Sequence, residues 1–124
     1  MAERLKNRAD FLRAQRGVRK IMPGLTLETC ATPPAFAKPG CFRVGFTASR
    51  KVGGAVARNR AKRRLRAAAA AVLPLSAREC TDYVLVARSS TLERPFDGLL
   101  KDLVAATAAV HVKLRAGEDI EKAR

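Results

Sequence analysis

Alternating apolar and polar residues predict several β-strands in this chain, because side chains of a strand point to opposite faces in turn. The alternation is clear at residues 25–29 and again at residues 42–47. A further short strand is expected at residues 18–22, before a Pro-Gly turn. Residues 82–88 are apolar at consecutive positions and rich in β-branched side chains. This last pattern predicts a central strand that is buried on both faces.

Three other segments place apolar residues at the spacing of a helix. The first helix is expected at residues 8–16. The second is expected at residues 55–72, where Pro74 ends it. The third is expected from residue 95 to Gly117. The predicted buried sides are Leu5, Phe11, Leu12 and Gln15 at the first helix, and Ala61, Leu65, Ala68 and Val72 along the second.

The order of these elements is helix, two or three strands, helix, strand, helix. A strand, a crossover helix and a second strand imply a parallel pair, so the predicted class is α+β with a mixed sheet of about four strands. The length of 124 residues suits one small domain. We assign residues 1–117 to this domain and residues 118–124 to a charged C-terminal tail that frays.

The distribution of charge predicts a polyanionic partner. The net charge is +14, and residues 29–78 carry eleven basic groups without one Asp or Glu. A surface kept charged only for solubility usually mixes both signs, so nucleic acid is the expected partner. No run of about 18 apolar residues and no secretory signal is present, which predicts a cytoplasmic protein without a membrane span.

Few residues of this chain suit metal binding or catalysis. Cys30, Cys41 and Cys80 are widely spaced and odd in number, which favours reduced thiols over disulfides or a zinc site. His111 is the only histidine. Metal-dependent cleavage of a phosphodiester needs converging carboxylates or histidines. We therefore expect no catalytic residue and no metal ligand in the protein itself.

The second predicted helix carries the basic residues of the middle segment. Arg58, Lys62 and Arg66 recur every four residues and form one ridge along it. Guanidinium groups bind phosphates in a two-pronged way, which suits a fixed RNA backbone. Asn59 can both donate and accept, as a 2′-hydroxyl or a base edge requires. The ridge is flanked by Arg60, Arg63 and Arg64, and a basic glycine turn with Arg50 and Lys51 precedes it.

A resemblance to a known family rests on these same residues. The sequence is similar to the protein subunit of bacterial ribonuclease P at Arg43-Val44-Gly45-Phe46-Thr47, at Lys51-Val52-Gly53, and above all at Arg58-Asn59-Arg60 with Lys62-Arg63 and Leu65-Arg66. It extends to Arg4-Leu5-Lys6, Asp10-Phe11, Asp82-Tyr83-Val84 and the last helix. The resemblance implies a left-handed crossover between the parallel strands, against the general rule.

The resemblance also implies the function. The protein would bind a large catalytic RNA, which itself holds Mg²⁺ and removes the 5′ leader of precursor tRNA, and no protein partner would be required. The residues implied to bind the catalytic RNA are Arg50, Lys51, Arg58, Asn59, Arg60, Lys62, Arg63 and Arg66. We add Arg64 to these RNA-binding residues, because it flanks the same basic ridge. The single-stranded leader would lie in a cleft beside the first helix, lined by Phe11, Gln15 and Leu27.

Two alternatives remain open at this point. A small, basic α+β protein of the ribosomal type would show a similar composition, and the RNA that co-purifies distinguishes the two. Phe11 can be either a cleft residue that stacks on bases or an ordinary core aromatic. A membrane-surface helix is a weaker alternative, because such helices carry large apolar residues opposite the charge.

Overall fold

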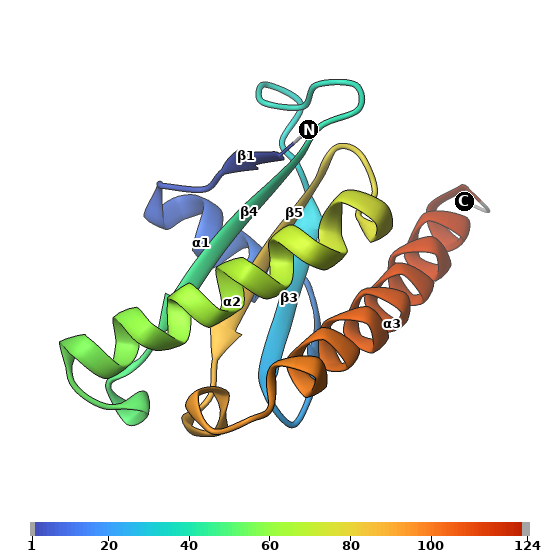
Figure 1. Cartoon of the computed structure of the whole chain (residues 1–124). Helices are drawn as coiled ribbons and strands as arrows, with labels where there is room; N and C mark the ends of the chain where they lie inside the picture. Colours follow the sequence, from blue (N-terminus) through green and yellow to red (C-terminus); the bar gives the residue numbers. More distant parts are fainter. Residues whose placement is uncertain (1, 123–124) are drawn as a thin grey trace.

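The computed structural model describes residues 2–122. Figure 1 shows a single sheet with helices on both faces. The elements follow in the order β1 (Ala2–Arg4), α1 (Arg8–Gln15), β2 (Val18–Ile21), β3 (Leu25–Ala31), β4 (Phe42–Ala48), the 3₁₀ turn η1 (Arg50–Val52), α2 (Ala55–Ser76), β5 (Thr81–Ala87), the 3₁₀ turn η2 (Ser89–Leu92) and α3 (Phe96–Lys122).

The sheet is mixed, as the sequence predicted. Its strand order is β1-β4-β5-β3-β2. β4 runs parallel to β5, and β3 runs antiparallel to both β5 and β2. The fifth strand, β1, was not expected, because three largely polar residues show no alternation. It pairs in parallel with β4 from Ala2 opposite Phe42 to Arg4 opposite Val44.

The crossover from β4 through α2 to β5 is left-handed. In Figure 1, α2 crosses in front of the sheet while β4 and β5 both run downwards, with β5 to the right of β4. A right-handed connection would place β5 on the other side. The handedness implied by the family resemblance is therefore confirmed.

Two apolar clusters lie on the two faces of the sheet. The larger cluster joins α2 and α3 to the side chains that β3, β4 and β5 direct toward them, and Leu27 and Tyr83 are fully buried within it. The smaller cluster lies under α1 and contains Leu5, Ala14 and Val84. Alternation along β5 accounts for this division, because Tyr83 and Val84 are neighbours that point to opposite faces.

Two predicted helix ends are wrong. α2 continues through Pro74 to Ser76, and the N–H of Ala77 still donates to the carbonyl of Leu73 at 2.8 Å. A proline near the end of a helix removes one hydrogen bond but need not stop the chain from continuing. α3 continues past Gly117 to Lys122. Residues 123–124 of the predicted tail lie outside the described residues.

Candidate nucleic-acid interface

The helix α2 divides its surface between core and solvent as its sequence predicted. The stripe of Ala61, Leu65, Ala68 and Val72 is buried, together with Ala69 and Leu73. Small residues in this stripe allow the helix to lie close to the sheet. The basic residues occupy the remaining arc, where Asn59, Arg60 and Arg63 are exposed and Arg58, Lys62, Arg64 and Arg66 are half-buried.

The charges of this arc are not neutralised within the protein. Among the described residues, no ion pair involves a basic residue of α2. The first turn of the helix also lacks an acidic residue. Uncompensated like charges on one helix repel one another and destabilise it slightly. Binding of a polyanion removes this repulsion, which is why such an arc suits a phosphate backbone.

The turn before α2 places two further basic side chains beside it. Arg50 and Lys51 are exposed on η1. Gly53 follows with a φ of 141°, a conformation that L side chains rarely adopt, and a Cβ there would lie 2.8 Å from that of Ala57. The glycine therefore permits the sharp entry into the helix that holds η1 against its first turn.

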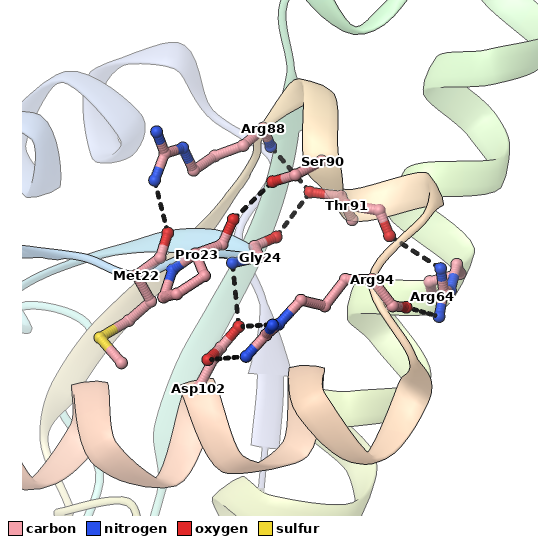
Figure 2. Close-up of polar contacts among 9 residues, drawn as sticks. All are labelled: Met22, Pro23, Gly24, Arg64, Arg88, Ser90, Thr91, Arg94 and Asp102. Atoms are coloured by element: carbon pink, nitrogen blue, oxygen red, sulfur yellow. Dashed lines mark hydrogen bonds and ion pairs between the residues drawn. The ribbon is translucent and has the colours of Figure 1, made fainter.

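Arg64 differs from the other arginines of α2, because its guanidinium is bound inside the protein. Its Nη1 donates to the carbonyl oxygens of Thr91 at 2.8 Å and Leu92 at 2.6 Å, and its Nη2 donates to the carbonyl of Arg94. Figure 2 shows the side chain reaching from α2 to the η2 segment. These bonds fasten the basic helix to the loop that leads into α3.

The same loop is held from its other side by α3 and the β2–β3 turn. Arg94 donates from Nε and Nη2 to the two carboxylate oxygens of Asp102, each at 3.0 Å (Figure 2). The Oδ2 atom of Asp102 also accepts from the N–H of Gly24 at 2.9 Å. Thr91 in turn donates from Oγ1 to the carbonyl of Gly24 at 2.7 Å. Arg64 thus belongs to a continuous polar network that spans four elements.

A cleft of about 530 Å³ lies on the other face of the sheet, beside α1. We call it the leader cleft, after the role that the family resemblance implies for it. Phe11 and Gln15 line it, as the family resemblance implied. Phe11 also packs against the small cluster of Leu5, Ala14 and Val84. It is half-buried, so its position is compatible with both of the roles that the sequence left open. The full lining is Lys6, Arg8, Phe11, Leu12, Gln15, Glu28, Phe46, Thr47, Ser49, Val84 and Val86.

A buried ion cluster fixes α1, and with it Phe11, to the sheet. Arg43 on β4 donates to both carboxylate oxygens of Asp82, at 2.8 and 2.6 Å, and to Asp10 at 3.0 Å. Burial alone would raise the pKa of Asp10, but hydrogen bonds from Arg13 and Arg43 outweigh it and hold the pKa below its usual value. Asp10 precedes Phe11 directly, so this cluster positions the aromatic ring.

The ring of Phe11 lies against Gly45. A Cβ at Gly45 would lie 2.8 Å from two atoms of that ring. Such a distance is too short for two carbon atoms, so any other residue would displace Phe11 from the sheet. This close approach explains why a glycine stands in the middle of β4.

The prediction that Leu27 lines the cleft is wrong. Leu27 is fully buried in the large cluster, on the face of the sheet that α2 and α3 cover. The neighbouring residue Glu28 lines the leader cleft instead. The strand β3 points its odd residues to one face and its even residues to the other. The buried side expected for α1 also differs, because Asp10 and Ala14 are buried while Leu12 is exposed.

Glu28 is the acidic residue in the lining of the leader cleft, whose other residues are basic, uncharged polar or apolar. Burial raises its pKa, and the charge of Arg19 on the adjacent strand lowers it only in part. Lys6 and Arg8 line the same cleft. The sequence offered a signal for Glu28, since it stands out of phase with Leu25 and Leu27.

Other reactive groups of the chain are scattered. Within residues described by the structure, no group of three or more His, Cys, Asp or Glu side chains could hold a metal ion. The three cysteines are free thiols, and burial raises the pKa of Cys30 to about 11, which keeps it protonated at neutral pH. None of the described helices is long and apolar enough to cross a membrane.

Comparison with known proteins gives one consistent family. A family model described as Ribonuclease P matches residues 1–111. A ribonuclease P protein component of Paramagnetospirillum magneticum is 50% identical over 109 residues, covering 87% of this chain and 82% of the relative. That of Ruegeria pomeroyi is 50% identical over 108 residues, covering 86% and 85%. The solved RNase P protein of Staphylococcus aureus superposes with a TM-score of 0.68 at 25% identity, covering 88% of this chain and 95% of that one.

Proposed function

Because the chain belongs to the ribonuclease P protein family, we propose that it is the protein subunit that helps a catalytic RNA remove the 5′ leader of precursor tRNA. Membership of this family implies a ribonucleoprotein endoribonuclease and an RNA partner. The ribosomal-type alternative is thereby set aside. The proposal also assigns a protein surface to each RNA, and it assigns cleavage of the phosphodiester to one of the two subunits.

The basic arc of α2 binds the catalytic RNA in this proposal. The observation that supports it most directly is the set of basic residues on α2 that form no ion pair within the described part of the chain, next to Arg50 and Lys51 of η1. Arg58, Arg60, Lys62, Arg63 and Arg66 contact phosphates, and Asn59 contacts a 2′-hydroxyl or a base edge. Arg64 is the exception, since its donors are engaged by backbone carbonyls.

The leader cleft binds the single-stranded leader. Phe11 supplies a ring on which an unpaired base can stack. Lys6 and Arg8 at the cleft supply charges for the leader phosphates. The family resemblance implies a second cleft aromatic at the position of Gln15, so stacking in this chain depends more heavily on Phe11.

Catalysis takes place in the RNA. The described residues offer no carboxylate or histidine cluster that fits Mg²⁺, so the ion that cleaves the phosphodiester is bound by the RNA partner. The protein contributes by offsetting phosphate repulsion, which allows the RNA complex to form at lower Mg²⁺. It acts in the cytoplasm and needs no protein partner.

Reconstitution with the RNA subunit of the same organism tests this function. The purified protein alone leaves precursor tRNA uncut, and adding it to the RNA subunit stimulates 5′ cleavage at low Mg²⁺. Cleavage by protein that has been treated with nuclease and repurified would contradict the assignment of catalysis to RNA. Absence of stimulation at every Mg²⁺ concentration would contradict the proposed function itself.

A further inference from the structure

A second cavity lies on the face of the sheet opposite the leader cleft. Its volume is about 280 Å³, and it is enclosed by β1, the facing part of β4 and the second half of α2. We call it the edge pocket. Its walls are almost wholly apolar, formed by Phe42, Val44, Phe46, Ala69, Ala70 and Leu73. An open cavity of this size and character is suited to a flat ring such as a nucleobase, whose faces pack on apolar side chains while its polar edge stays in contact with water at the open side.

Two basic side chains line the edge pocket, where they can bind the phosphates of an RNA strand. Arg4 of β1 and Arg66 of α2 both line it. The guanidinium carbon of Arg4 lies 5.9 Å from the ring centre of Phe46, a cation–π geometry. The one acid of the lining, Glu3, accepts a hydrogen bond from Lys38 at 2.8 Å, so its charge is compensated. The apolar interior with cationic rims matches a base with its flanking phosphates.

The edge pocket and the leader cleft meet at Phe46, which lines both. β1 pairs with β4 only as far as Val44. Beyond this point, in the described part of the chain, no strand covers the outer edge of β4. A single strand that leaves the leader cleft at Phe46 can therefore pass over this edge and reach the pocket on the other face.

We propose that the edge pocket holds the base of an unpaired leader nucleotide, next in the strand to those bound in the leader cleft. This inference rests on the proposed function, because it requires the leader cleft to hold the leader. It adds a second subsite, with Phe46 as the residue shared by both. Arg4, which lines the pocket on β1, binds the phosphate beside that nucleotide.

Filling the pocket tests the proposal. Ala70 is exposed and lines the pocket, so Ala70→Leu places an apolar side chain in it while keeping a good helix former. Ala71 is exposed on the same helix and lines neither cavity, so Ala71→Leu is the matched control. Both variants and the wild type are assembled with the RNA subunit. Each is then titrated with precursor tRNAs that carry a single abasic nucleotide at successive leader positions.

The expected result is one leader position at which removing the base weakens binding about 5-fold or more to the wild type and to Ala71→Leu, the effect of losing one stacked base. In the Ala70→Leu holoenzyme, the same abasic nucleotide changes the affinity less than 2-fold. Equal abasic effects in all three proteins would overturn the proposal. The proposal would also be overturned if Ala70→Leu, but not Ala71→Leu, bound the RNA subunit more weakly in the absence of tRNA. The occupant of the pocket would then be a base of the catalytic RNA.

A parallel titration with Phe11→Leu separates this proposal from the function on which it rests. One result is that the abasic effect at some leader position is lost in Phe11→Leu, while every position behaves in Ala70→Leu as it does in the wild type. This result rejects the edge pocket and leaves the leader cleft in place. If no leader position affects binding to any of the proteins, the leader-binding function itself fails.

Discussion

The Nη1 atom of Arg64 donates to the backbone carbonyl of Thr91 across a distance of 2.8 Å, although these residues stand on different sides of β5 in the sequence. The bond joins the basic helix to the η2 segment, which also contacts η1. η1 carries Arg50 and Lys51. An arginine that sequence alone assigns to RNA therefore holds together the elements that present the other basic side chains.

Replacing Arg64 by Ala is expected to lower stability rather than the salt dependence of RNA binding. The change leaves three carbonyls of the η2 segment without their donor, and each lost bond of this kind costs about 1 kcal/mol. Arg63→Ala is the control, since Arg63 is exposed and of the same type. Thermal melting should show a drop of several degrees for Arg64→Ala and little change for Arg63→Ala.

Binding to the catalytic RNA at several salt concentrations completes this comparison. Arg63→Ala should flatten the log–log slope by roughly 0.7–0.9, the value for one phosphate contact, while Arg64→Ala leaves the slope unchanged. If Arg64→Ala flattens the slope as much as Arg63→Ala does, the guanidinium binds RNA and not the η2 carbonyls in the complex.

The fold was largely predictable, because its long elements have strong periodic signals. The stripe of α2 follows from the helical spacing of its apolar residues, and the central position of β5 follows from its run of consecutive apolar residues. β1 was missed because its three residues gain their pairing from β4 rather than from their own pattern. The left-handed crossover came only from the family resemblance, since no local signal encodes it.

The site was less predictable, because side-chain direction depends on register. Leu27 and Glu28 are neighbours on β3 and face opposite ways, so an error of one position moves a residue from the cleft to the core. The hydrogen bonds of Arg64 to backbone carbonyls could not be predicted from the sequence either. Its carbonyl partners at Thr91, Leu92 and Arg94 come near it only in the folded chain.

Phe11→Leu should reduce the preference for precursor over mature tRNA. Leucine keeps much of the apolar contact with Leu5, Ala14 and Val84, so the protein stays folded, but it offers no aromatic ring. Affinity for precursor tRNA should fall by about 1–3 kcal/mol, the worth of one base–aromatic stack. Affinity for mature tRNA, which has no leader, should not change. A folded variant that keeps its full preference for the precursor would exclude Phe11 from leader binding.

Glu28 should make leader binding dependent on pH. Burial raises the pKa of this carboxyl above 4.5, its ordinary value. The neutral form is favoured in the folded protein, so its contribution to stability is present at low pH and is lost as the pH rises through the folded-state pKa. Removing the negative charge also removes repulsion of leader phosphates. Precursor affinity should therefore increase as the pH falls from neutral toward the raised pKa of Glu28.

The variant Glu28→Gln isolates this effect, because an amide of the same shape does not titrate. It should bind precursor tRNA more tightly than the wild type at pH 7 and show a flatter pH profile between 7 and 5. Affinity for mature tRNA serves as the reference at each pH. Parallel profiles for the two proteins would show that Glu28 does not face the leader.

The central claim, that the basic arc of α2 binds the catalytic RNA, is tested most directly by salt dependence in the double variant Arg58→Ala/Arg60→Ala. Its control, Lys20→Ala/Lys101→Ala, removes the same charge from exposed positions on β2 and α3. Binding of each to the catalytic RNA is measured over a series of salt concentrations, with thermal melting to confirm the fold. The Arg58/Arg60 variant should lose roughly 1.4–1.8 from the log–log slope, the value for two phosphate contacts, while the control keeps the wild-type slope. Equal slopes in all three proteins would contradict this claim.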